Sequence, residues 1–219
     1  MTPSLTRIDI LRHGEPVGGR RYRGQIDDPL SERGWAEMRA ATAGERPWTA
    51  IVSSPLARCR AFAEALAAEN DLPLRFDPRW MEVGFGVWEG RTAAEIEAAT
   101  PGAVRAFKRD PVGCRPAGAE PLAAFHARIA DAFETVLAGH VGGHPLVVAH
   151  AGAIRMAIAY VLGMPAEHAY RIQVASAARA RFQIESGEWG EHRALLHLTP
   201  TPGGERDARV KHLAPAGGG

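Results

Sequence analysis

The sequence predicts an α/β fold, a three-layer α/β/α sandwich built around a mostly parallel sheet. Short apolar segments typical of buried strands alternate along the chain with segments whose apolar residues recur at helical spacing. Strands that alternate with helices in this way favour a parallel sheet with helices on both faces.

Strands are expected at the short apolar segments, which are residues 7–11, 49–53, 72–76, 146–149, 171–174, 178–184 and 193–198. Helices are expected at residues 31–43, 55–66, 92–99, 103–109, 119–137 and 152–162. Ser31 is a good N-cap, and Pro55 suits the first turn of a helix. We expect a single domain over 1–198 with a helical insert at about 92–118, followed by a disordered, Pro/Gly-rich tail over 199–219.

Composition and charge narrow the class of protein. The chain is 46% hydrophobic and 23% charged, which is ordinary for a globular protein, and its net charge of +1 gives no reason to expect nucleic acid or a membrane surface as a partner. Cys59 and Cys114 form no CxxC pair and are expected to be free thiols in a reduced cytosol. The N-terminus lacks the apolar core of a signal peptide, so we expect a cytoplasmic protein.

Polar side chains follow three predicted strands at the point where each strand ends. Arg12 and His13 follow the first strand, Arg58 comes shortly after the second, and His150 ends the strand at 146–149. Because open α/β sheets bind ligands at the carboxyl ends of their strands, we expect these four side chains to gather into a pocket for a dianion. The helix that starts near Pro55 is expected to add backbone N–H groups to that pocket.

A histidine in such a pocket can attack phosphorus and form a covalent intermediate. Metal chemistry is not predicted, because the chain has no HExxH motif and the pair His140 and His144 lies in a Gly-rich loop. No cofactor is expected either, since there is no GxGxxG motif or Walker loop.

Five sequence blocks resemble the signature of the histidine phosphatase superfamily, the phosphoglycerate-mutase-like enzymes. They are Leu11–Glu15 (LRHGE), Gly24–Gly34 (GQIDDPLSERG), Ser53–Arg60 (SSPLARCR), Glu82 with Phe85–Gly90 (FGVWEG), and Val147–Gly152 (VVAHAG). The blocks come in the family's order. The resemblance implies a phosphoglycerate-mutase-like fold and phosphoric monoester hydrolysis.

The resemblance also implies a role for each matched residue. His13 would accept the phosphoryl group, and Glu82 would protonate the leaving oxygen and then activate water. Glu89 is the competing acid, and Glu82 is preferred on the family pattern alone. The phosphoryl oxygens would be held by Arg12, Arg58 and His150.

One position departs from the family pattern. Many relatives place an asparagine a few residues after the Arg-His-Gly run, where it touches the phosphate, and Gly19 stands near that place here. The candidates to replace this contact are Arg20, Arg21, Arg23 and Gln25.

Residues 20–38 and Gly163–Glu167 resemble the α-ribazole phosphatases of cobalamin assembly, which remove the 5′-phosphate of a nucleotide-like riboside. The implied partner is a small-molecule phosphomonoester, and a homodimer is compatible with the sequence. Direct substrate contacts are expected from Tyr22, Arg23, Gly24 and Gln25. The rings that could stack on an aromatic base are Tyr22, Trp80, Phe85 and Trp88.

Other functions stay open. A broad sugar-phosphate phosphatase, including one with fructose-2,6-bisphosphatase-like activity, would use the same residues. A phosphoglycerate mutase is less favoured because mutases of this superfamily carry a longer insert, although this one has basic residues at Arg91, Arg105, Lys108, Arg109 and Arg115. A non-catalytic phosphate-binding module is disfavoured because competent residues fill all five candidate catalytic positions.

Overall fold

A mixed sheet forms the centre of the molecule. The computed structural model describes residues 3–44 and 47–199, and within them the sheet has six strands in the order β3-β2-β4-β1-β5-β6. The strands are β1 (Ser4–Arg12), β2 (Ala50–Ser53), β3 (Leu74–Phe76), β4 (Pro145–Ala149), β5 (Arg179–Gly187) and β6 (Gly190–Thr199). The first four run parallel to one another, and β5 and β6 are added antiparallel beside β1 at one edge.

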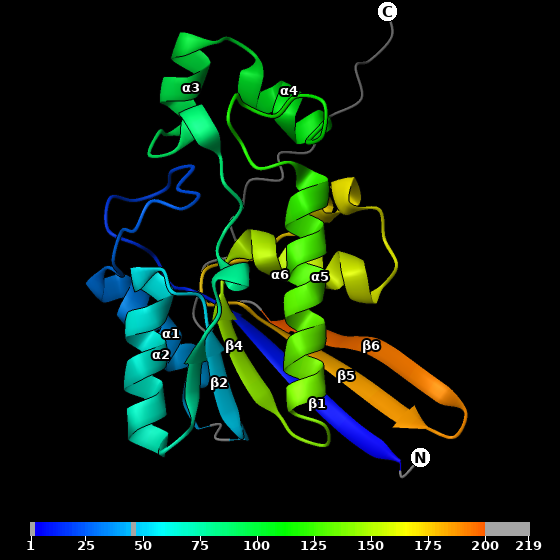
Figure 1. The fold of residues 1–219 in the computed structure, drawn as a ribbon. Coiled ribbons are helices and arrows are strands. Elements are labelled where there is room, and N and C mark those ends of the chain that lie inside the picture. The colour runs from blue at the N-terminus through cyan, green and yellow to red at the C-terminus, as the bar shows by residue number, and fades with distance from the viewer. Residues whose placement is uncertain (1–2, 45–46, 200–219) are drawn as a thin grey trace, which may run out of the picture.

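Helices cover both faces of this sheet (Figure 1). The helices α1 (Glu32–Thr42) and α2 (Ala57–Asn70) lie on one face, and α5 (Leu122–Gly139) and α6 (Ala151–Val161) lie on the other. Successive side chains of β1 alternate between the two cores, because Ile8 and Ile10 pack with α5 and α6 whereas Leu11 packs with α1 and α2. The predicted three-layer α/β/α fold is confirmed.

The remaining helical segments lie toward the carboxyl ends of the parallel strands. Figure 1 shows α3 (Ala93–Ala99) and α4 (Ala103–Arg109) stacked beyond the edge where β2 and β4 end. Short 3-10 turns are η1 (Pro78–Trp80), η2 (Gly86–Trp88) and η3 (Ala166–Arg171). No helix in the described parts of the chain is long and apolar enough to cross a membrane.

Local signals explain where several helices begin. The Ser31 hydroxyl accepts the Gly34 N–H at 3.0 Å and caps α1, as predicted. Thr92 and Glu95 form a reciprocal capping box at the start of α3. The start of α5 is predicted at residue 119, but the helix begins at Leu122, because Pro121 is its N-cap and a proline disfavours helical backbone at the residue before it.

One predicted strand is wrong. Residues 171–174 were expected to form a strand, but η3 ends at Arg171 and the following residues run irregularly up to β5. The carbonyl groups of Ile172 and Val174 accept hydrogen bonds from the side chains of Arg155 and Arg12, not from a neighbouring strand. The predicted disordered tail falls on residues 200–219, which lie outside the described residues, apart from Thr199 at the end of β6.

Candidate active site

The register of β1 and β4 brings His13 and His150 together. Arg12 lies opposite Ala149 in the sheet, so the histidines that follow these two residues leave the sheet at the same level. The His13 N–H still donates to the Ala149 carbonyl at 2.9 Å, and the two imidazole rings meet edge to face with centroids 5.1 Å apart. The predicted pair of histidines is therefore assembled by the ends of two neighbouring parallel strands.

Each imidazole has a defined hydrogen-bond partner. His13 Nδ1 lies 2.7 Å from the Gly14 carbonyl, which can only accept, so Nδ1 carries the proton and Nε2 keeps its lone pair. His150 is completely buried, and its Nε2 lies 2.8 Å from the Ser54 hydroxyl. Only 6% of His13 is exposed, so both rings are held with little freedom.

Two arginines flank the histidines, and Arg58 is buried whereas Arg12 is half-buried. Arg58 is 1% exposed and donates from Nη1 to the Ile26 carbonyl at 2.6 Å and from Nη2 to the Gly24 carbonyl at 2.8 Å. Arg12 donates from Nη1 to the Val174 carbonyl at 2.7 Å. The buried Nε atoms of both arginines have no hydrogen-bond partner among the described residues, so both guanidinium groups keep donor capacity for an anion.

Burial and positive charge determine the protonation of the site. Burial, followed by the charges of Arg12 and Arg58, holds the pKa of His13 well below its usual value. Burial and the same two arginines also lower the pKa of His150, and the neighbouring His13 adds to this effect. Burial and the neighbouring Arg155 lower the pKa of Arg12 to about 10. At neutral pH the pocket therefore holds two neutral imidazoles beside positively charged guanidinium groups.

Glu82 reaches the same pocket from the loop between η1 and η2. Its Oε2 accepts the Gly152 N–H at 3.0 Å, in the first turn of α6, and its Oε1 accepts its neighbour's Val83 N–H at 2.9 Å. Gly152 directly follows the sequence His150-Ala151, so the carboxyl group lies next to the second histidine. Arg128 of α5 fixes the loop by donating to the Met81 and Glu82 carbonyls at 2.8 and 3.1 Å.

This geometry brings a neutral imidazole, two guanidinium groups with unused donors and one carboxyl group close together. A family model of the histidine phosphatase superfamily (branch 1) matches residues 8–194. The chain belongs to this superfamily. The resemblance stated from the sequence and the prediction of a phosphatase enzyme are both confirmed.

Three relatives show how this histidine phosphatase compares with known proteins. A mycobacterial glucosyl-3-phosphoglycerate phosphatase, solved with VO3, is 31% identical, with a TM-score of 0.78 and coverage of 89% of this chain and 99% of that one. The α-ribazole phosphatase from Shigella flexneri is 25% identical, with a TM-score of 0.71 and coverage of 86% and 95%. The probable phosphoglycerate mutase GpmB of Salmonella paratyphi B is 29% identical over 191 residues, which are 84% of this chain and 88% of that protein.

The predicted substrate-contact segment, residues 22–25, lies beside the site. Tyr22 packs edge to face against Phe85 and Trp88 with ring centroids 5.2 Å away in each case. The Arg23 guanidinium donates to Asp28 at 3.0 Å and to the Val17 carbonyl at 2.7 Å. Direct substrate contacts from Tyr22, Arg23, Gly24 and Gln25 stay predictions, and the structure shows these residues bonded within the protein.

The rings expected to stack on a base are mostly part of the protein interior. Trp80 has no exposed surface, so its suggested contact with a substrate is wrong. Trp88 is 8% exposed, and with Tyr22 and Phe85 it surrounds Phe107 of α4. These rings join the helical insert to the site.

Among the candidates for the missing asparagine contact, Arg20 has its side chain available. Arg21 donates to the Gly18 and Gly90 carbonyls, and Arg23 is bonded within its own loop. The Gln25 amide donates to the Glu82 carbonyl at 3.4 Å. Arg20 makes no hydrogen bond to a described residue, yet it lies near enough to Arg12 to contribute to lowering that residue's pKa.

Other expectations need correction or addition. The N–H groups that open α2 were predicted to face the anion, but the Ala57 N–H donates to Asp27 and the Leu56 N–H donates to Ser54. Two residues near the histidines are not predicted from the sequence: Ser54, although it lies inside a matched block, and Arg155, the one charged residue of the otherwise apolar α6. Arg128 carries no sequence signal, because a charged residue on a long helix is ordinarily solvated.

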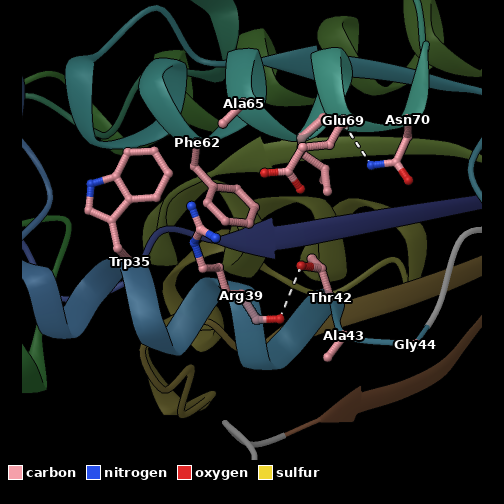
Figure 2. A pocket seen from close by; sticks show the side chains of 10 residues that line it. Trp35, Arg39, Thr42, Ala43, Gly44, Phe62, Ala65, Glu69 and Asn70 are labelled. Atoms are coloured by element: carbon pink, nitrogen blue, oxygen red, sulfur yellow. Dashed lines mark hydrogen bonds between the residues drawn. The ribbon is translucent and has the colours of Figure 1, made fainter.

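Away from the histidines, Figure 2 shows a hollow between α1 and α2, lined by Trp35, Arg39, Phe62 and Glu69 among others, and no residue of the candidate site lines it. Within the described residues, no three His, Cys, Asp or Glu side chains are grouped as metal ligands would be.

Proposed function

We propose that this histidine phosphatase hydrolyses small phosphomonoesters through a phosphohistidine formed on His13. The hydrogen bond from His13 Nδ1 to the Gly14 carbonyl carries this proposal, because it leaves the Nε2 lone pair free in a buried, neutral ring. Arg12, Arg58 and His150 supply donors around that nitrogen, and phosphoryl transfer depends mainly on positioning and charge stabilisation of this kind.

The reaction then has two steps. In the first, His13 Nε2 attacks phosphorus, the bond from phosphorus to the ester oxygen breaks, and protonated Glu82 gives its proton to the leaving oxygen. In the second, the Glu82 carboxylate takes a proton from water, the resulting oxygen attacks phosphorus, and the P–N bond breaks to release phosphate and neutral His13. Glu82 suits this exchange because its two oxygens each accept one backbone N–H and retain a further position for a proton.

Substrates with different leaving groups test the proposed roles. His13→Ala should abolish turnover of p-nitrophenyl phosphate, whereas His192→Ala, which changes an exposed histidine on β6, should not. Glu82→Gln should cost about 10²–10⁴ in kcat/KM, which reports the phosphorylation step, on an alkyl phosphate whose leaving oxygen needs a proton, and less on p-nitrophenyl phosphate. Full activity of His13→Ala, or equal losses of kcat/KM on both substrates for Glu82→Gln, would contradict the assigned roles. EDTA should leave the rate unchanged.

For the substrate, we propose α-ribazole 5′-phosphate on the strength of the matched loop at residues 20–38. The similarity to the solved α-ribazole phosphatase supports this choice. The loop after β1 carries the motif, and it lies against the site through Gly24 and Gln25.

A phosphomonoester whose alcohol carries a carboxylate is the second candidate. Arg155 of α6 donates to the Ile172 carbonyl and lies near both Glu82 and Tyr170. Burial raises the pKa of Tyr170, and the neighbouring Arg115 opposes that effect. Arg155 and Arg115 thus place positive charge near Glu82, where it suits a second anionic group of the substrate. The similarity to the glucosyl-3-phosphoglycerate phosphatase supports a carboxylate-bearing substrate as well.

A substrate panel separates these candidates. It contains α-ribazole 5′-phosphate, glucosyl-3-phosphoglycerate, sugar phosphates, fructose 2,6-bisphosphate, and 3-phosphoglycerate with a 2,3-bisphosphate primer. The highest kcat/KM on the first would support the proposal, and a preference for the second that Arg115→Ala removes would favour the carboxylate class. Isomerisation of 3-phosphoglycerate would favour a mutase, and tight phosphate binding without turnover would favour a binding module.

A further inference from the structure

We propose that Glu89 is a positioning residue that joins the two loops carrying the phosphate-binding and proton-transferring groups. The first loop, residues 24–28, follows β1 and holds Arg58, and the second, residues 82–90, carries Glu82. This inference rests on the proposed function, because it assigns the proton transfer to Glu82 and the positioning of that residue and Arg58 to Glu89.

One oxygen atom makes the connection. Glu89 Oε1 accepts the Gln25 N–H from the first loop at 3.1 Å and the Phe85 N–H from its own loop at 2.9 Å. Gly24 has a positive φ of 54°, and a Cβ atom at this position would collide with the same oxygen. The two loops therefore approach closely around a single carboxyl oxygen.

The first loop, which Glu89 holds in place, in turn positions the phosphate-binding Arg58. Both terminal nitrogens of Arg58 donate hydrogen bonds to this loop, Nη2 to the Gly24 carbonyl and Nη1 to the Ile26 carbonyl. These two carbonyls lie on either side of Gln25, whose N–H Glu89 accepts. The Asp27 carboxylate also caps the Ala57 N–H at the start of α2, the helix that bears Arg58. A shift of this loop would move two acceptors of the guanidinium group at once.

Glu89 also fixes the position of the second loop, which carries the proton donor Glu82. The Gln25 amide donates to the Glu82 carbonyl at 3.4 Å, so the residue held by Glu89 also contacts the backbone of Glu82. Phe85, whose N–H Glu89 accepts, lies three residues after Glu82. Glu89 thus acts on Glu82 through the backbone, while the Glu82 carboxyl group itself contacts Gly152 beside His150.

Conservative variants of Glu89 separate positioning from acid catalysis. Glu89→Gln keeps an acceptor oxygen at the same place and removes the acid, whereas Glu89→Asp keeps the acid on a side chain one methylene shorter. Positioning predicts that Glu89→Gln stays within about 3-fold of wild type, while Glu89→Asp loses about 10-fold or more in affinity for inorganic phosphate and in kcat/KM. Acid catalysis by Glu89 predicts the reverse order, with Glu89→Gln the weaker enzyme.

The measurements are phosphate affinity by calorimetry, the pH profile of kcat/KM, and the melting temperature of each variant. We expect Glu89→Gln to keep the wild-type pH profile and Glu82→Gln to lose one limb of it while still binding phosphate. A Glu89→Gln profile that lacks a limb, or a Glu89→Asp enzyme with wild-type phosphate affinity, would overturn the inference. Phosphate affinity does not depend on turnover, so a failure of the phosphohistidine mechanism would be seen separately in His13→Ala.

Discussion

The Ser54 hydroxyl lies 2.8 Å from His150 Nε2, and both side chains are completely buried. Ser54 Oγ also accepts the Leu56 N–H at 3.4 Å, so its own hydrogen is free to point to the histidine. The hydroxyl donates to Nε2 or accepts from it according to the imidazole tautomer, and in either case the bond fixes the orientation of the ring. A serine at the end of β2 thereby orients a histidine at the end of β4.

Removing this hydroxyl should weaken catalysis more than folding. Ser54→Ala leaves His150 Nε2 with only the weak contact to Cys59 Sγ at 3.6 Å, and we expect kcat/KM to fall about 10-fold, as one buried hydrogen bond is lost. Ser53→Ala is the matched control, since Ser53 is equally buried and its hydroxyl donates to the Ser54 carbonyl. Steady-state kinetics on p-nitrophenyl phosphate would show this difference, and equal kcat/KM losses in the two variants would argue against an orienting role.

Gly152 marks the place where the Glu82 carboxyl group meets α6. A Cβ atom there would collide with Glu82 Oε1 and press on Phe125, so Gly152→Ala should displace the carboxyl group that we propose as proton donor and lower kcat at least about 10-fold. Gly139→Ala is the control, because a Cβ at the end of α5 would meet no atom within 4 Å. The control should keep full activity, and an active Gly152→Ala enzyme would show that the carboxyl position is not critical.

The buried histidines should make the protein less stable in mild acid. Their pKa values lie below the ordinary 6.5 in the folded state, so below about pH 6.5 the unfolded chain binds protons that the folded chain does not. Stability is then fully present above pH 7 and falls toward pH 5.5, by about 1.4 kcal/mol for each histidine.

Urea unfolding without phosphate at pH 7.5 and 5.5 measures this loss. The double variant His13→Asn/His150→Asn should lose much less free energy of unfolding between the two pH values than wild type does. His192→Asn should behave as wild type, because its side chain is exposed. A pH dependence that survives in the double variant would place its origin elsewhere in the chain.

A separate buried charge supports the fold three residues before Arg12. Asp9 has no exposed surface and accepts from Arg181 at 2.7 and 2.9 Å and from Trp48 Nε1 at 2.9 Å. Burial tends to raise the pKa of Asp9, but Arg181, His144 and Trp48 together hold it below its usual value. This stabilisation is present above about pH 4 and is lost as the pH falls further.

Asp9→Asn should therefore lower the free energy of unfolding by about 3–5 kcal/mol, because positive charges are left buried without their counter-charge. Urea titration at pH 7.5 would measure the loss. The fraction that remains folded should keep the wild-type KM, since Asp9 is not part of the site. A change below about 1 kcal/mol would show that the ion pair adds little stability.

The sequence predicted the histidines and arginines of the site because parallel strands end at one edge of a sheet. Arg12, His13 and His150 follow from that rule, and Arg58 follows from the helix after β2. The irregular course after Arg171 could not be predicted, since the Val174 carbonyl is occupied by an arginine 162 positions away. The role of the aromatic residues near the site could not be predicted either, because a ring that stacks on a ligand and a core ring such as Trp80 cannot be told apart from sequence.

Trapping the phosphoenzyme shows whether His13 is the nucleophile. Glu82→Gln should still be phosphorylated by labelled p-nitrophenyl phosphate, whose leaving group needs no proton, but should hydrolyse the intermediate slowly. We predict base-stable, acid-labile phosphate on the peptide that contains His13, and none in the His13→Ala/Glu82→Gln double variant. Turnover without any label on His13 would contradict the mechanism.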